Sequence, residues 1–241
     1  MNTAHLAPPR IAFWHRKGGT GKTSLAIGCA VRLAGGSAPG THAERHSPAP
    51  GARVLLLDTD PQGTAAAWGE RFADRFGIAV RADSGFALWR DWAERANRFD
   101  AVLVDCPPTV SPEVMEILAG VDRLLVPTRP AWPDVWALES VADLVADLHR
   151  QGARLAVSVV FNQVGDEALA PFAAAIADLG LDLLPEAIPR DGAWPALFGG
   201  GEPPDSLAPL IGTLVRSARI DMAIENGRMT GCPCWTSSRH Y

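Results

Sequence analysis

The sequence predicts an α/β protein with a doubly wound, mostly parallel β-sheet and helices on both faces. Short apolar runs alternate with segments of helical periodicity along most of the chain, which is the pattern of repeated strand–helix units. The apolar runs are nearly continuous, as expected for strands buried on both faces of a parallel sheet. A glycine-rich segment, Lys17–Thr23, joins the first apolar run to the first helical segment.

Length and composition fit a single domain. The chain has 241 residues, of which 47% are hydrophobic and 20% are charged, so a sizeable core is possible. We expect the domain to span 10–220 and to contain a flexible loop insertion at 35–51, where Gly, Pro and Ser occur without periodicity. An N-terminal extension at 1–9 precedes it, and a tail at 221–241 is expected to be disordered.

Seven apolar segments are predicted as strands, because they are rich in Val, Leu, Ile and Phe and are short. In chain order they are Arg10–His15, Val54–Asp58, Ile78–Arg81, Ala101–Asp105, Arg123–Pro127, Arg154–Phe161 and Leu183–Ile188.

Helices are predicted where apolar residues recur three and four positions apart. The segment Lys22–Leu33 places Leu25, Cys29 and Leu33 on one face, and Asp134–Arg150 has the clearest amphipathic pattern. The other predicted helices are Thr64–Phe76, Gly85–Asn97 with its aromatic stripe, Pro112–Leu118, Glu167–Leu179 and Ser206–Ile220, while Arg190–Asp205 is predicted as a Gly/Pro-rich loop.

The segment Lys17-Gly-Gly-Thr-Gly-Lys-Thr23 has the properties of a phosphate-binding loop. Its three glycines let the backbone approach a polyphosphate and direct N–H groups inward, and the helix that follows adds the positive end of its dipole. Lys22 can then reach the β- and γ-phosphates, and the Thr23 hydroxyl can bind Mg²⁺.

This loop departs from the usual G-x-x-x-x-G-K-[ST] pattern. Arg16 occupies the position of the first glycine, and a second lysine, Lys17, lies five residues before Lys22. These are the only two lysines, since the other 20 basic residues are arginines. Such restricted use of lysine indicates that both positions need a compact, flexible ammonium group.

Three motifs in this order resemble those of the ParA/MinD family. The loop K-G-G-T-G-K-T resembles the family's deviant Walker A motif, and Val102-Leu-Val-Asp105-Cys-Pro-Pro108 resembles its Walker B strand and turn. Between them, Asp58-Thr-Asp60-Pro-Gln-Gly63 resembles the second motif and favours the ParA-like branch. The resemblance covers about 10–219, and it implies a P-loop NTPase fold that binds ATP and Mg²⁺.

The acidic residues of these motifs lie at the carboxyl ends of predicted strands, where doubly wound sheets bind ligands. Asp58, Asp60 and Asp105 are therefore expected to converge on one nucleotide. Thr23, Asp58 and Asp105 would bind Mg²⁺, the two aspartates mostly through water. By resemblance, Asp60 would orient the attacking water. The residues expected to contact the nucleotide are Lys17, Gly18, Gly19, Thr20, Gly21, Lys22, Thr23, Ser24 and Asn162.

Two of these assignments depend most on the resemblance. Lys17 would reach the γ-phosphate of a partner subunit, so that hydrolysis would require an ATP-bound sandwich dimer. Asn162, at the end of a predicted strand, would read adenine, and a turn-forming asparagine is the alternative interpretation.

The resemblance also suggests where DNA would bind. In Ile188-Pro-Arg190 the arginine corresponds to a DNA contact of the family, and Arg216 and Arg219 lie one turn apart on the last predicted helix. Together they could form a basic stripe that contacts phosphates. The net charge of −5 gives no general attraction for DNA, so scattered solubilising arginines are the alternative.

These observations predict a ParA-like ATPase that partitions or positions a cargo: a plasmid, a chromosome or a protein assembly. ATP would drive dimerisation, the dimer would bind DNA non-specifically, and a cargo-bound activator protein would stimulate hydrolysis. We expect a cytoplasmic, nucleoid-associated protein with no membrane partner, since neither a signal peptide nor a run of 18 apolar residues is present.

Two alternatives come from the same superfamily. A MinD-like membrane-associated regulator would need a C-terminal amphipathic helix, and the residues of 226–241 have no such pattern. A nucleotide-switch carrier with an iron–sulfur cluster would need bridging cysteines at a dimer interface. Cys106 lies in the Walker B turn, and Cys232 and Cys234 lie in the tail, so neither position suits that role.

Overall fold

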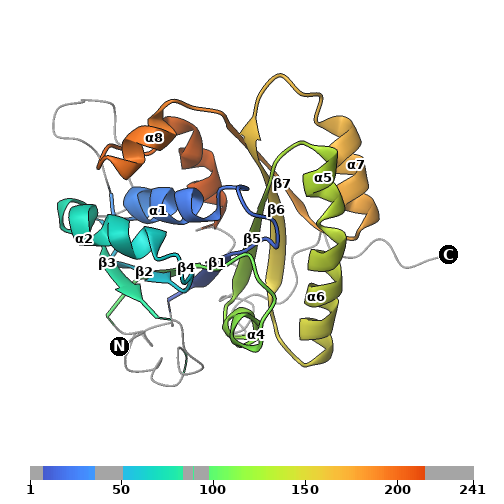
Figure 1. Cartoon of the computed structure of the whole chain (residues 1–241), viewed down its shortest axis with the longest axis horizontal. Helices are drawn as coiled ribbons and strands as arrows, with labels where there is room; N and C mark the ends of the chain where they lie inside the picture. Colours follow the sequence, from blue (N-terminus) through green and yellow to red (C-terminus); the bar gives the residue numbers. More distant parts are fainter. Residues whose placement is uncertain (1–7, 36–50, 84–88, 90–97, 215–241) are drawn as a thin grey trace, which may run out of the picture.

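The computed structural model describes residues 8–35, 51–83, 89 and 98–214 (Figure 1). Several sequence predictions fall outside these residues: most of the N-terminal extension, the insertion between 36 and 50, most of the aromatic segment 85–97, and the tail. Arg216, Arg219, Cys232 and Cys234 also lie outside the described residues.

A seven-stranded sheet forms the centre of the molecule. Its strands are Arg10–Phe13 (β1), Val54–Asp58 (β2), Ala79–Ala82 (β3), Ala101–Asp105 (β4), Arg123–Thr128 (β5), Ala156–Val164 (β6) and Leu183–Pro189 (β7). They are ordered β3-β2-β4-β1-β5-β6-β7, and every neighbouring pair is parallel. All seven predicted strands are confirmed; β2 and β4 have the predicted bounds, and the ends of the other five shift by one to three residues.

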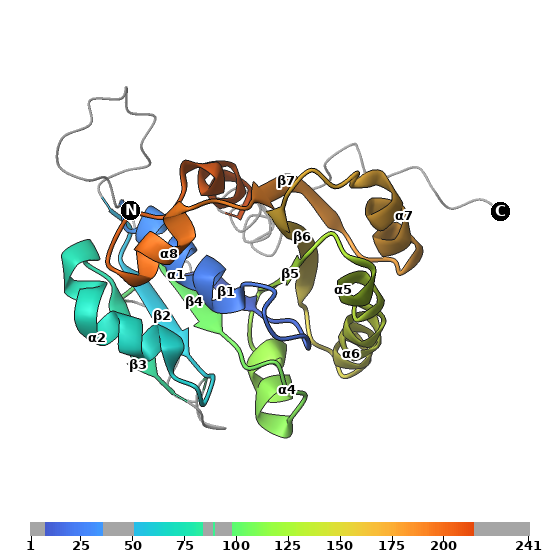
Figure 2. The same cartoon turned by 45° about the horizontal axis from the view of Figure 1, so that its top comes forward.

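Helices cover both faces of the sheet (Figure 1; Figure 2). They are Lys22–Leu33 (α1), Thr64–Phe76 (α2), Pro112–Ala119 (α4), Trp132–Trp136 (α5), Glu139–Arg150 (α6), Ala170–Asp178 (α7) and Ala193–Phe198 (α8), with a 3₁₀ turn at Asp205–Leu207 (η1) that leads into helical residues 208–214. No helix among them combines the length and apolar character that a membrane crossing requires.

Two hydrophobic cores result from the alternation of side chains along each strand. Ile11 and Phe13 of β1 pack with α1, α2 and α8, whereas Ala12 of β1 and Trp14 just after it pack with α4, α5, α6 and α7. Strands β2 and β4 are buried along their whole length, which explains their continuous apolar sequences. The predicted doubly wound architecture is confirmed.

Two segments differ from the sequence prediction. The single helix predicted over Asp134–Arg150 is two helices, α5 and α6, because the backbone tightens at Leu138, whose N–H bonds to Val135 O at 3.0 Å. Val135 and Leu138 remain buried, so the apolar spacing continues through the break and conceals it. The predicted loop Arg190–Asp205 contains the short helix α8.

Candidate functional site

The polar residues of the three motifs meet at the carboxyl ends of the central strands. Asp58 of β2 pairs in register with Asp105 of β4, and Asp105 pairs with Phe13 of β1. The loop after β1 leads directly into α1, so the glycine-rich segment lies over this edge of the sheet (Figure 1). This is where a doubly wound sheet binds its ligand.

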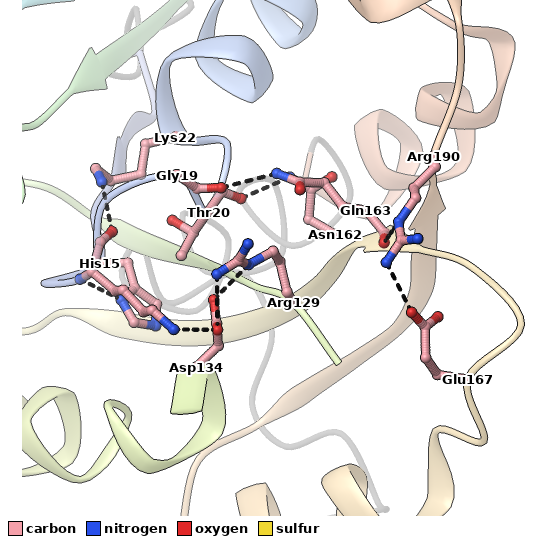
Figure 3. A network of polar contacts seen from close by, with 11 residues as sticks. His15, Gly19, Thr20, Lys22, Arg129, Asp134, Asn162, Gln163, Glu167 and Arg190 are labelled. Atoms are coloured by element: carbon pink, nitrogen blue, oxygen red, sulfur yellow. Dashed lines mark hydrogen bonds and ion pairs between the residues drawn. The ribbon is translucent and has the colours of Figure 1, made fainter. Parts of the chain in front are cut away.

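The glycine-rich loop is shaped for an anion. Gly21, the N-cap residue of α1, has a φ of 94°, and Gly19 has a φ of 76°, which are conformations that favour glycine. Among the described residues, no hydrogen bond is formed by the backbone N–H groups of Gly18, Gly19, Thr20 or Gly21. The carbonyl groups of Gly19 and Thr20 do accept hydrogen bonds, from side chains of β6 (Figure 3). The loop therefore has free donors and engaged acceptors.

Lys22 extends from the first turn of α1 and is buried. Its Nζ donates to the carbonyl oxygen of Lys17 at 3.2 Å, which folds the side chain back over the loop. Burial lowers the pKa of Lys22, and the nearby Asp105 and Asp60 carboxylates oppose that change. A buried ammonium group so placed gains an electrostatic partner when a polyphosphate binds.

Asp105 is the most unusual group of the site. It is 1% exposed, and neither carboxyl oxygen has a hydrogen-bond partner among the described residues. Burial raises the pKa of Asp105 to about 7, with repulsion from Asp58 and Asp60 adding to the rise, while the Thr23 hydroxyl and the Lys22 ammonium oppose it. A buried acid whose oxygens lie near Thr23 and Lys22 but accept no hydrogen bond of normal geometry from the described residues is suited to a cation or its bound water.

Asp58 and Asp60 shape the chain between β2 and α2. The two oxygens of Asp58 accept hydrogen bonds from Asp60 N at 3.1 Å and from Ala66 N, in the first turn of α2, at 2.7 Å. Asp60 Oδ1 accepts from Gln62 N at 2.9 Å. Asp58 therefore binds backbone groups directly, as an acid near a helix N-terminus does, and would approach a metal only with its remaining lone pairs.

Lys17 is held by an ion pair within its own chain. Its Nζ binds Oδ2 of Asp134, the buried acid of α5, and Arg129 donates to the same carboxylate at 2.8 and 3.0 Å. Although burial opposes it, hydrogen bonds from Arg129 and Lys17 lower the pKa of Asp134. One buried carboxylate thus has two cations, whose side chains are 31% and 37% exposed.

His15 fixes the start of the loop. It is fully buried, and its Nδ1 accepts the backbone N–H of Lys17 at 2.9 Å. Burial lowers the pKa of His15 to about 4, with the Lys22 charge adding to the effect, so the ring is neutral near pH 7. The sequence prediction missed His15, Arg129 and Asp134, because none of them belongs to a motif and their proximity depends on the order of β1 and β5 in the sheet.

The end of β6 holds the other side of the loop. Asn162, predicted to read adenine, is 3% exposed and donates from Nδ2 to Thr20 O at 2.8 Å. Its neighbour Gln163 donates from Nε2 to Gly19 O at 3.0 Å. Adenine recognition by Asn162 stays a prediction, and Gln163 is a further contact that sequence analysis missed.

Arg190, the described member of the predicted DNA-binding set, is paired. Its guanidinium binds Glu167 at 2.9 Å and also donates from Nε to Gln163 O at 3.0 Å. The side chain is nevertheless 68% exposed at the edge of the sheet. DNA contact by Arg190 stays a prediction, and a DNA phosphate would have to compete with Glu167 for the guanidinium.

Relatives of known sequence match part of the chain. No protein-family model matches it. The "Maintenance of carboxysome distribution protein A" of Gloeobacter kilaueensis is 31% identical over 151 residues, which cover 62% of this chain and 60% of that protein. The "Chromosome-partitioning ATPase Soj" of Thermus thermophilus is 31% identical over 176 residues, which cover 61% and 64%. The chain thus spans less than two thirds of the length of both relatives.

Solved structures share the fold at lower identity. The McdA–ATP complex of Cyanothece has a TM-score of 0.60 with 17% identity and covers 94% of this chain and 99% of that one. MinD of Aquifex aeolicus has a TM-score of 0.61 with 17% identity and covers 93% and 98%. A cobyrinic acid a,c-diamide synthase of Mycobacterium smegmatis with bound ADP and magnesium has a TM-score of 0.63 with 19% identity and covers 95% and 100%.

The solved structures share the fold of this chain, and the two curated relatives are 31% identical to it over the part that matches. Together with the all-parallel order of the sheet, these similarities support the resemblance of the chain to the ParA/MinD family, whose fold it shares.

Proposed function

We propose that this protein is a Mg²⁺-dependent ATPase that hydrolyses ATP as a sandwich dimer. The observation that carries the proposal is the arrangement around α1: a loop with free N–H groups lies beside a buried lysine and a buried, unpaired carboxyl group. Phosphate oxygens would satisfy the donors and Lys22, and a hydrated cation would satisfy Asp105.

The residues present fit a nucleotide with Mg²⁺. The loop residues Gly18–Gly21 and Lys22 would hold the β- and γ-phosphates, with Ser24 in the first turn of α1, and Thr23 and Asp105 would hold the cation. The described residues contain no cluster of three His, Cys, Asp or Glu side chains able to hold a metal. Bound Mg²⁺ would therefore depend on phosphate oxygens and water, and it would neutralise charge on the phosphates.

Hydrolysis needs an oriented water and a further positive charge, because phosphoryl transfer depends on positioning and charge neutralisation. Asp60 would orient the water from the turn after β2. Lys17 would supply the charge to the nucleotide of a partner subunit, as the family resemblance implies. For that it must leave Asp134, and Arg129 would then remain as the counter-ion of that buried carboxylate.

We further propose that the ATP-bound dimer binds DNA without sequence preference and positions a cargo in the cytoplasm, in association with the nucleoid. Support comes from two relatives, which are named for carboxysome distribution and chromosome partitioning. A cargo-bound protein would stimulate hydrolysis. Arg190 is the described residue that would contact DNA, with Arg216 and Arg219 from the part of the chain beyond the described residues.

Nucleotide binding and hydrolysis test the first proposal. Purified protein should hydrolyse ATP slowly with Mg²⁺ and should lose this activity with EDTA. Lys22→Ala should bind ATP at least tenfold more weakly, on the order of the loss of one charge-assisted contact. Replacing the exposed Arg150 by alanine is a matched control that removes a cation far from the loop. Equal ATP affinity in Lys22→Ala and wild type would refute the loop assignment.

Light scattering with ATP tests the dimer. Lys17→Ala should bind ATP without forming a productive dimer, whereas Asp60→Ala should form a dimer that persists because the water is not oriented. If wild type and Asp60→Ala both stay monomeric with ATP, the sandwich dimer is wrong.

A mobility-shift titration of the Asp60→Ala dimer tests DNA binding. Unrelated duplexes should shift equally, and the affinity should fall steeply between low and physiological salt, because each phosphate contact releases counter-ions. Absence of a shift at low salt would refute DNA binding, and binding to anionic vesicles in a parallel flotation assay would favour the MinD-like alternative.

A further inference from the structure

Gln163 has an unusual backbone conformation. Its φ is 58°, and no other residue except glycine has a positive φ among those the structure describes. It lies near the end of β6, where the register with β7 shifts between Asn162 and Val164. A side chain larger than Asn or Asp in this left-handed region costs about 1 kcal/mol, so its persistence needs compensating contacts.

The side chain of Gln163 reaches the phosphate loop. Its amide nitrogen donates to Gly19 O at 3.0 Å, next to the bond from Asn162 to Thr20 O (Figure 3). Because a trans peptide is planar, the N–H of a residue points opposite to the carbonyl before it. The two bonds therefore turn the N–H groups of Thr20 and Gly21 away from β6, toward the side of the loop that a phosphate would occupy.

A second set of contacts holds the backbone of Gln163 in place. Its carbonyl oxygen accepts from Nε of Arg190 at 3.0 Å, and the backbone N–H of Arg190 donates to Val164 O at 2.9 Å. Glu167 binds the guanidinium of Arg190 at 2.9 Å and also accepts the N–H of Gly165 at 2.6 Å. Arg190 thus binds the backbone carbonyls of Gln163 and Val164 and, through Glu167, contacts the segment that follows them.

We propose that Gln163 is a positioning residue of the phosphate loop and that Arg190 holds it in its left-handed conformation. The inference rests on the proposed nucleotide binding. Gln163 orients the Gly19 peptide, which aims the N–H of Thr20 at the nucleotide. Arg190 therefore contributes to nucleotide affinity in the absence of DNA, in addition to any contact with DNA.

The experiment compares folding stability with nucleotide affinity. In Gln163→Gly, the backbone strain is relieved but the amide donor is lost. This variant should be at least as resistant to urea as wild type, yet it should bind a fluorescent ATP analogue with Mg²⁺ about 3- to 10-fold more weakly, as for one lost hydrogen bond. A merely structural residue would change both quantities in the same direction. Gln151→Ala, at the exposed end of α6, is the matched control.

Two further variants complete the test, all without DNA. Gln163→Glu keeps the size of the side chain but places acceptors against Gly19 O, so it should bind the analogue more weakly than Gln163→Gly does. Arg190→Ala should weaken binding in the same direction by a smaller factor. If wild type binds the analogue and both Gln163 variants bind it as tightly as wild type does, the positioning role is refuted. If wild type itself does not bind, the proposed function is refuted and this inference with it.

Discussion

Replacing Asp105 by asparagine tests whether its unpaired carboxyl group is a cation-binding position. Burial raises its pKa from the ordinary value of 3.8 to about 7, and the Asp58 and Asp60 charges add to the rise. Between these pH values the unfolded chain has lost the proton while the folded protein retains it. The free energy of unfolding therefore falls as the pH rises from about 4 to about 7 and stays low above it. The difference between these two pKa values corresponds to a loss of at most about 4 kcal/mol in the free energy of unfolding.

At pH 8 without Mg²⁺, Asp105→Asn should be more stable than wild type by about 2 kcal/mol. We expect about half of the limit, because the asparagine amide must still be buried with imperfect hydrogen bonding. Near pH 4 the wild-type carboxyl group is protonated in the folded protein and about half protonated in the unfolded chain, so little of the pH-dependent loss of stability remains. Asp105→Asn should then be less stable than wild type by up to about 2 kcal/mol, because the cost of burying the amide remains. Urea unfolding followed by tryptophan fluorescence at both pH values measures this difference.

The matched control is Asp58→Asn. Asp58 is equally buried and lies beside Asp105 in the sheet, but its oxygens already accept two backbone hydrogen bonds. This variant should be less stable than wild type at pH 8. Added Mg²⁺ and ATP should raise the stability of wild type and should raise that of Asp105→Asn much less. If Asp105→Asn is less stable than wild type at pH 8, the carboxyl group has partners and the reasoning is wrong.

Three further substitutions address the rest of the site. Asp134→Asn should lower stability in urea by about 1–3 kcal/mol, less than for a fully buried pair because Lys17 can reach water, and should lower the ATP concentration needed for dimerisation seen by light scattering. Gly21→Ala should abolish ATP-analogue binding, because its Cβ would lie 2.2 Å from Asn162 Nδ2 at a φ of 94°. His15→Asn should lose less stability than wild type between pH 6.5 and pH 4, where the folded protein keeps His15 neutral and the unfolded chain is protonated.

Local sequence patterns predicted most of the fold. Continuous apolar runs identified β2 and β4, and the ends of α1 and α2 were predicted to the residue, because glycines lie beside both helices. Apolar periodicity failed to show where one helix ends and the next begins when the spacing of buried residues continues through the break. Val135 and Leu138 are buried on opposite sides of the break between α5 and α6, so periodicity could not locate it. The short helix α8 lies among prolines and glycines that favour a loop.

The motifs predicted the phosphate loop and the strand-end acids, but not the contacts that hold them. Ion pairing of Lys17 with Asp134 depends on where α5 begins after β5, which no local pattern specifies. Gln163 could be placed beside the loop only from the order of the strands and its left-handed backbone. The environment of Asp105 likewise depends on packing, since its motif shows the acid but not the absence of partners.

Some polar groups of the site already have hydrogen-bond or ion-pair partners, and others have none among the described residues. Carbonyl groups of the loop are held by Asn162 and Gln163, and Lys17 is held by Asp134, so these groups need no ligand. The free N–H groups of the loop and the Asp105 carboxyl group have no such partners among the described residues. Binding of a phosphate with a cation would satisfy both sets while the loop keeps its shape. The chain would therefore lose little conformational entropy on binding a nucleotide, whereas moving Lys17 would require an existing ion pair to break. If the proposed dimer forms, nucleotide binding and dimer formation would be separate steps, and the second would require the Lys17–Asp134 contact to break.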